Sequence, residues 1–150
     1  MPFRVTMKMP TGRTRHILVV DDEPLVRQSV QILLQEDDDG YVVHEANSGA
    51  EALALFEPGK FDMVFIDYFM PEMKGDQLAA TIKQRSPNQP VVMITAYPER
   101  LQSLVNPAGG ADSVICKPFG LDNLRAALTQ HAPAWNLASQ FPIVKNAEET

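Results

Sequence analysis

Three carboxylates, one hydroxyl group and one ammonium group stand directly after short apolar runs of the sequence. They belong to Asp21, Asp22, Asp67, Thr95 and Lys117. Each residue alone is weak evidence, because an Asp after a strand is often only a helix cap and a buried Thr is more often structural. Their recurrence at the ends of four apolar runs is hard to explain as packing. We therefore expect one shared chemical site.

Such a cluster of carboxylates requires a cation. Two carboxylates about 5 Å apart repel by about 3 kcal/mol at an effective dielectric of about 20, which raises the pKa of one of them. Oxygen ligands without a neighbouring His are typical of Mg²⁺, which retains water ligands and bridges to phosphate. An ionised Asp67 could then attack phosphorus, while the ion, Lys117 and Thr95 neutralise the phosphoryl oxygens. The pattern predicts aspartyl phosphate chemistry.

The apolar runs that precede these residues are typical of buried strands. They span residues 17–20, 63–66, 91–94 and 113–116, and a weaker run at 41–44 suits an edge strand. The runs are continuous rather than alternating, as expected for a parallel sheet that is covered on both faces.

Between the runs, the apolar period becomes helical. Pro24 suits the first position of one helix, and Ser48 with Glu51 forms an S-x-x-E capping box before another, which Pro58-Gly59 should end. The apolar positions of the four predicted helices are Val26, Val30, Leu33 and Leu34; Ala52, Leu55 and Phe56; Leu78, Ala79 and Ile82; and Leu121, Leu124 and Leu128. A further helix at 99–105 is only weakly indicated, because prolines bracket it.

Strand and helix alternation predicts βαβ units and a doubly wound α/β domain with helices on both sides of the sheet. The carboxyl ends of the strands then share one edge, where ligands bind in such folds. The chain of 150 residues fits one domain. We expect a disordered N-terminal tail at 1–14, the domain at 15–131 and a C-terminal tail or linker at 132–150.

Composition excludes several classes of function. The net charge is −6, and residues 21–62 hold eleven acids, which would repel nucleic acid. Cys116 is the single cysteine, so neither an intrachain disulfide nor a cysteine zinc cluster can form, and we expect an inert core thiol. No apolar run is long enough for a membrane span or a signal-peptide core, which predicts a cytoplasmic protein without membrane contact. His16, His44 and His131 lack metal-ligand spacing and are expected at the surface or at strand edges.

Four segments carry a resemblance to a known family. They are VVDDEP at 19–24, DYFMPEMKG at 67–75, VMITA at 92–96 and GADSVICKPF at 110–119. The chain resembles the receiver domain of two-component response regulators across residues 15–131. The resemblance implies a flavodoxin-like (βα)5 sandwich with a five-stranded parallel sheet in the order 2-1-3-4-5.

The resemblance also implies the roles of the acidic residues. Asp67 would be the phosphoacceptor, and a histidine kinase or phosphotransfer protein would be the donor. Asp22 and Asp67 would bind Mg²⁺ directly, Asp21 would bind it through water, and the Phe69 carbonyl would add a ligand. The chain would act as a phosphorylation-dependent switch that assists its own phosphorylation and dephosphorylation, and not as a conventional enzyme.

The remaining matched residues would sense the phosphoryl group. Thr95 would be the switch hydroxyl and Lys117 the phosphate partner, with Ala96 beside the threonine. Pro118 would follow a cis peptide bond, a geometry that is tolerable at an X-Pro bond. Together with Ala96 and Pro118, three further positions are expected to modulate the site: Phe69, Tyr97 and Val114.

Two of these positions depart from the family pattern. Receivers commonly carry an aromatic residue three positions before the lysine, where this sequence has Val114. Tyr97 could replace that aromatic residue in the switch, or it could be a rim residue without a switching role. Phe69 and Tyr97 occupy the variable positions beside the phosphoryl site. Their bulk could shield the phosphoryl group from water, which predicts a long-lived phosphorylated form.

Two other readings of the same residues remain open. A phosphatase of the haloacid dehalogenase type also uses Asp, Thr, Lys and Mg²⁺, but it needs a second Asp two residues after the nucleophile, where Phe69 stands. A docking scaffold that needs no phosphorylation would have no use for three adjacent carboxylates. No output module fits after residue 131, so we expect a downstream protein partner or a missing output domain, and a homodimer that could depend on phosphorylation.

Overall fold

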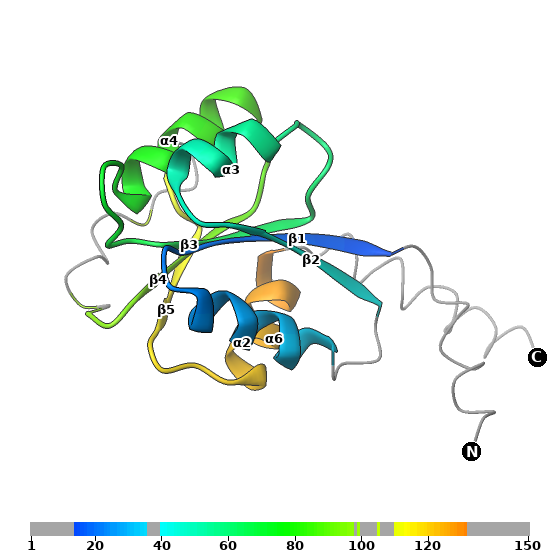
Figure 1. The fold of residues 1–150 in the computed structure, drawn as a ribbon. Helices are drawn as coiled ribbons and strands as arrows, with labels where there is room; N and C mark the ends of the chain where they lie inside the picture. The colour runs from blue at the N-terminus through cyan, green and yellow to red at the C-terminus, as the bar shows by residue number, and fades with distance from the viewer. Residues whose placement is uncertain (1–13, 36–39, 98, 100–104, 106–109, 132–150) are drawn as a thin grey trace, which may run out of the picture.

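Five parallel strands form one sheet in the order β2-β1-β3-β4-β5, as the resemblance implies (Figure 1). The computed structural model describes residues 14–35, 40–97, 99, 105 and 110–131. The strands are β1 (Arg15–Val20), β2 (Tyr41–Ala46), β3 (Met63–Asp67), β4 (Val91–Thr95) and β5 (Ser113–Cys116). The helices are α2 (Pro24–Gln35), α3 (Gly49–Leu55), α4 (Gly75–Arg85) and α6 (Leu121–His131). The doubly wound α/β prediction is therefore confirmed.

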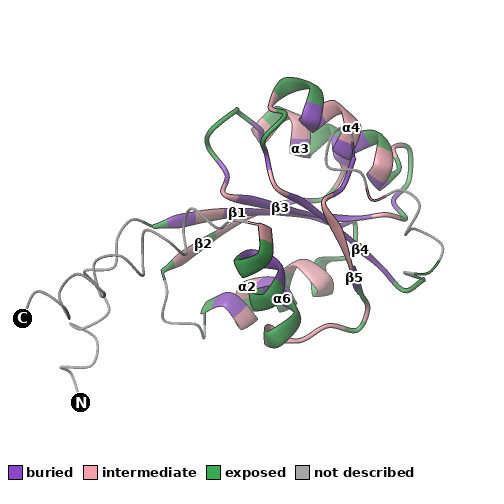
Figure 2. Ribbon diagram, turned by 180° about the vertical axis from the view of Figure 1, so that it is seen from behind, coloured by how far each residue is buried: buried purple, intermediate pink, exposed green. Residues whose placement is uncertain are grey.

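Helices cover both faces of the sheet. Helices α3 and α4 lie on one face and α2 and α6 on the other (Figure 1). Successive residues of β1 alternate between two apolar cores: Leu18 and Val20 pack on the α3 and α4 side, whereas Ile17 and Val19 pack on the α2 and α6 side. Strands β3 and β4 are buried along their length, and β1 is buried at every residue except His16 (Figure 2). Burial on both faces explains why their sequences are continuously apolar.

The local sequence signals that predicted helix ends lie at or near the observed ends of α2 and α3. Helix α2 begins at Pro24. The Ser48 hydroxyl accepts a hydrogen bond from the Glu51 amide at 3.1 Å, as in a capping box, but the Glu51 carboxylate accepts from the Asn47 amide, one residue before the cap. Helix α3 ends at Leu55, ahead of the predicted Pro58-Gly59 stop.

One prediction about burial is wrong. Cys116 was expected in the core, but its side chain is exposed and its thiol donates to the Lys117 carbonyl at 3.2 Å. The reason is its place at the end of β5, an edge strand that is only partly covered. Most of 99–105 and both predicted tails, apart from Thr14, lie outside the described residues. No helix in the described parts of the chain is long and apolar enough to cross a membrane.

Candidate functional site

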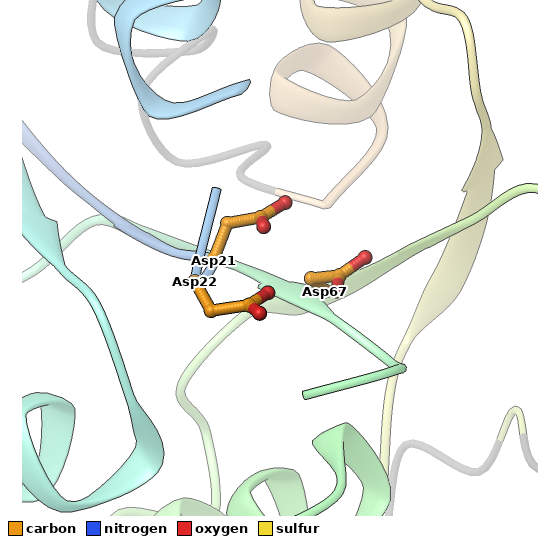
Figure 3. A group of neighbouring side chains, drawn as sticks. All are labelled: Asp21, Asp22 and Asp67. Atoms are coloured by element: carbon orange, nitrogen blue, oxygen red, sulfur yellow. The ribbon is translucent and has the colours of Figure 1, made fainter. Parts of the chain in front are cut away.

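Three carboxylates from two neighbouring strands converge at the carboxyl edge of the sheet. Val20 pairs with Ile66 in the register of β1 and β3, so Asp21 and Asp67 follow side by side. One carboxylate oxygen from each of Asp21, Asp22 and Asp67 lies within 4.8 Å of the others (Figure 3). We call these residues the acid triad. Asp21 and Asp67 are buried and Asp22 is exposed, so the triad is open on one side.

Lys117 brings a positive charge to the triad from the end of β5. Its ammonium nitrogen lies 2.9 Å from Asp67 Oδ1 and 3.5 Å from Asp21 Oδ2. Glu23, which the sequence did not single out, lies 3.7 Å away and is more exposed. The peptide bond between Lys117 and Pro118 is cis, as the resemblance implied. One ammonium group thus faces several carboxylates.

Burial and the excess of acidic groups shift the pKa values of the side chains in the site. Burial raises the pKa of Asp67 to about 6, and the charges of Asp21 and Asp22 add to this effect, whereas the hydrogen bond from Lys117 opposes it. Burial also raises the pKa of Asp21. Burial alone would lower the pKa of Lys117, but its hydrogen bond to Asp67 and the acidic charges outweigh that effect and raise it. The site therefore favours additional positive charge.

The donor atoms of the triad fit a Mg²⁺ ion. Asp21 Oδ1 accepts a hydrogen bond from the Glu23 amide at 2.9 Å. Its other oxygen, Oδ2, is buried and accepts no hydrogen bond from the described residues. A buried carboxylate oxygen without a donor is costly, and a cation or a water bound to one would satisfy it. All three side chains offer only oxygen, which is the donor type that Mg²⁺ prefers.

Thr95 lies beside this cluster at the end of β4. It is buried, and its hydroxyl oxygen accepts a hydrogen bond from the Tyr97 amide at 3.0 Å. The Lys117 amide donates to the Thr95 carbonyl at 2.8 Å, which ties the ends of β4 and β5 together. Ala96 follows at the exposed rim. The five predicted site residues thus meet at one edge of the sheet.

Gly75 is a site residue that the sequence reasoning did not single out. Its amide donates to the Tyr68 carbonyl at 2.9 Å. A Cβ atom at this position would lie 2.7 Å from the Asp67 carbonyl oxygen and 2.8 Å from Tyr68 Cα, closer than real contacts allow. The loop before α4 therefore returns against the backbone of Asp67 only because residue 75 lacks a side chain.

Arg27 is a second residue that the sequence reasoning missed. It lies on α2 and donates to the Asp21 carbonyl at 2.7 Å, while its Nε donates to Glu45 Oε1 at 2.9 Å. The contact ties α2 to the start of the loop that carries Asp21. A signal was present, because Arg27 and Lys60 are the basic residues of the otherwise acidic stretch 21–62.

Two aromatic side chains stand at the rim. The rings of Phe69 and Tyr97 are half exposed and meet edge to face, with centroids 6.3 Å apart. The Lys74 ammonium lies 5.6 Å from the centre of the Phe69 ring. Val114 is half buried and packs against the core on the α3 and α4 side. The rim aromatics therefore contact each other, whereas position 114 supplies no ring.

A pocket of about 450 Å³ opens beside Lys117. It is bounded by α2, by the residue after β4 and by the turn before α6. Its lining residues are Val26, Ser29, Ala96, Lys117, Pro118 and Phe119. The lysine that faces the triad thus also borders a mainly apolar hollow on the α2 side.

Two comparisons of the sequence with known proteins find response regulators. The family model described as the response regulator receiver domain matches residues 17–129. The transcriptional regulatory protein SrrA of Staphylococcus aureus is 32% identical over 106 residues, which cover 71% of this chain and 43% of SrrA. The chain thus spans less than half the length of that relative.

Solved structures share the fold. The response regulator protein TrrA of Thermotoga maritima, in complex with Mg²⁺-BeF, is 32% identical with a TM-score of 0.69, and the match covers 79% of this chain and 99% of TrrA. A response regulator receiver domain protein from Clostridium thermocellum is 28% identical with a TM-score of 0.72, covering 82% of this chain and 98% of that one.

Proposed function

The chain belongs to the response regulator receiver family, and from this premise we propose that it is a signalling switch that accepts a phosphoryl group on Asp67. The observation that carries the proposal is the contact of Lys117 with Asp67 at 2.9 Å inside a cluster of three carboxylates. A structural ion pair has no need of the two additional acids, whereas an acceptor that must hold a metal ion and a phosphoryl group does.

The reaction transfers a phosphoryl group from a histidine nitrogen of the donor to a carboxylate oxygen of Asp67. A carboxylate oxygen of Asp67 attacks the phosphorus of a phosphohistidine, the new P–O bond forms as the P–N bond breaks, and the electron pair returns to the imidazole nitrogen. Asp22, Asp67 and the Phe69 carbonyl would hold a Mg²⁺ ion, with Asp21 bound through water, and the ion would neutralise charge on the phosphoryl oxygens. The pKa of Asp67, about 6, leaves it mostly ionised at neutral pH.

Two side chains of the site receive the transferred group. Lys117 exchanges its contact with the Asp67 carboxylate for one with a phosphoryl oxygen, to which its ammonium donates. The Thr95 hydroxyl oxygen already accepts from the Tyr97 amide, so its own proton is directed to another acceptor, for which we assign a second phosphoryl oxygen. Because the same hydroxyl oxygen accepts from the Tyr97 amide, this contact links phosphorylation to the position of Tyr97 at the rim.

Partners follow from the same chemistry. The donor is a histidine kinase or a phosphotransfer protein, and the pocket beside Lys117 gives room for the side chain that carries the phosphoryl group. The output is a downstream protein or a further domain. SrrA is a transcriptional regulatory protein. In this family the output can therefore be the control of transcription by a further domain.

The test is phosphorylation with a small donor. The chain is incubated with acetyl phosphate and Mg²⁺ and run on a phosphate-affinity gel, in which a shifted band is expected for the unaltered chain and for Asp122→Asn, an exposed acid of α6. Asp67→Asn is expected to abolish the shift. No shift in the unaltered chain would favour the docking scaffold, and turnover of small phosphate esters would favour the phosphatase.

The rim aromatics lead to a prediction about the lifetime of the phosphorylated form. Phe69 and Tyr97 meet edge to face beside Asp67, where they hinder the approach of water. Phe69→Asn is expected to speed dephosphorylation several-fold in a time course of the gel shift. Tyr97→Phe keeps the ring and is the matched control, with an unchanged rate. An unchanged rate in Phe69→Asn would refute the shielding role.

A further inference from the structure

Two histidines from adjacent strands meet far from the acid triad. His16 Nδ1 lies 3.0 Å from His44 Nε2, although 28 residues separate them in the sequence. In the parallel register of β1 and β2, His16 pairs with Val42 and Leu18 pairs with His44. The two imidazoles therefore project from the same face of the sheet, the one on which Leu18 packs towards α3 and α4.

Neighbouring groups hold the His44 ring and the His16 backbone in place. The Phe61 ring packs edge to face against the His44 ring, with centroids 5.2 Å apart and an interplanar angle of 79°. The backbone amide of His16 donates to Asp62 Oδ2 at 2.8 Å. Both histidines are half buried, so their nitrogens are held close together yet remain within reach of solvent.

We propose that His16 and His44 form a binding site for a divalent transition metal ion such as Zn²⁺, separate from the Mg²⁺ site. Two imidazole nitrogens bound to one tetrahedral zinc ion at about 2.05 Å lie about 3.3 Å apart. The observed nitrogens are 3.0 Å apart and the ring centroids 5.3 Å apart, so metal binding needs a small opening and a turn of each ring toward the ion. In the metal-free chain one of the facing nitrogens donates its proton to the other across this contact. When zinc binds, the donating ring carries its proton on its other nitrogen instead, so that both facing nitrogens offer a lone pair to the ion, and water completes the coordination.

The chemistry of the two sites separates their metals. Imidazole nitrogen favours zinc, copper and nickel, whereas the oxygen atoms of the acid triad favour magnesium. Burial lowers the pKa of His44, and the charges of His16 and Lys60 act in the same direction, which maintains the neutral form that binds metal. The Lys60 ammonium, 5.2 Å from the centre of the Phe61 ring, opposes a bound cation, and the nearby Asp62 carboxylate favours it.

The test is a titration of the full chain with ZnCl₂ by calorimetry, in the presence of saturating Mg²⁺. One saturable zinc site is expected in the unaltered chain, in Asp67→Asn and in the matched control His131→Gln, which removes the third histidine. His16→Gln and His44→Gln are each expected to weaken zinc binding by about tenfold or more, as perturbed metal sites do.

A second measurement on the unaltered chain does not depend on the folding of variants. In NMR spectra of the imidazole rings, zinc is expected to shift the signals of His16 and His44 and to leave those of His131 in place. The proposal is overturned if the unaltered chain has no saturable zinc site. It is equally overturned if Asp67→Asn abolishes zinc binding, or if both His16→Gln and His44→Gln bind zinc as tightly as the unaltered chain.

Discussion

Two lysine–aspartate pairs, each with one buried and one partly exposed side chain, lie at opposite edges of the sheet and have the same separation. Lys117 and Asp67 meet at 2.9 Å at the carboxyl edge, and Lys83 of α4 meets Asp112 at 2.9 Å at the amino edge, where β4 and β5 begin. Each lysine nitrogen lies 2.9 Å from one aspartate oxygen. Distance alone therefore does not distinguish the candidate functional site from a structural ion pair.

The surroundings of the two pairs differ in charge balance. In the described part of the chain, Lys83 forms an ion pair with one carboxylate, and the same Asp112 oxygen also accepts from the Val91 amide at 2.8 Å. Lys117 instead faces Asp67 and a second buried acid, Asp21, whose Oδ2 accepts no hydrogen bond from the described residues. A balanced pair holds elements together, whereas an excess of acid preserves a capacity to bind cations.

The largest effect is expected from breaking the balanced pair. Lys83→Met leaves the Asp112 carboxylate without its counter-ion at a site where the lysine side chain is 3% exposed. The free energy of unfolding, measured by urea denaturation, should fall by about 3 kcal/mol. Lys117→Met should lower the free energy of unfolding by less when Mg²⁺ is present, because the ion supplies positive charge to the triad. A larger loss for Lys117→Met than for Lys83→Met would contradict the comparison.

A smaller effect is expected from pH. The pKa of Asp67 is raised from 3.8 to about 6 in the folded chain, so between these values the folded state binds more protons than the unfolded state. Stability without Mg²⁺ should therefore fall as pH rises from about 4 to 7, by about 2 kcal/mol from this group. Asp67→Asn should remove that part of the pH dependence. Urea denaturation in EDTA across this range measures it, and an equal slope in both proteins would exclude Asp67 as its source.

The smallest effect is expected from Mg²⁺ binding. An ion that binds only the folded chain should raise the free energy of unfolding by about 1.4 kcal/mol at ten times its dissociation constant. Asp22 is exposed, so Asp22→Asn should leave the fold intact and remove most of this gain. Asp122→Asn, also an exposed acid, should retain it. Equal stabilisation of the two variants by Mg²⁺ in thermal melts would argue against Asp22 as a ligand.

Local sequence predicted the elements and the place of the site well. Apolar runs marked the strands, and Pro24 and Ser48 marked helix starts, because these signals act within a few residues. Asp21, Asp67, Thr95 and Lys117 were predicted to meet because carboxyl ends of parallel strands share one edge. Cys116 was placed wrongly, because an apolar run does not reveal that the end of an edge strand is uncovered.

Other contacts could not be predicted because they join distant parts of the chain. Lys83 and Asp112 are 29 residues apart, and His16 and His44 are 28 apart. Gly75 matters because a backbone carbonyl, that of Asp67, approaches it closely in space. Such contacts depend on strand register, helix placement and the reach of side chains, none of which appears as a spacing in the sequence.

By itself, the sequence determined which chemical groups follow which strands, and hence that acids, a hydroxyl and an ammonium group would gather at one edge. Only the tertiary structure decided which lysine is balanced and which faces an excess of carboxylates. The physical reason is that Coulomb energies and desolvation depend on distances of a few ångströms and on burial. Both quantities are set when the strands pair and the helices cover the sheet.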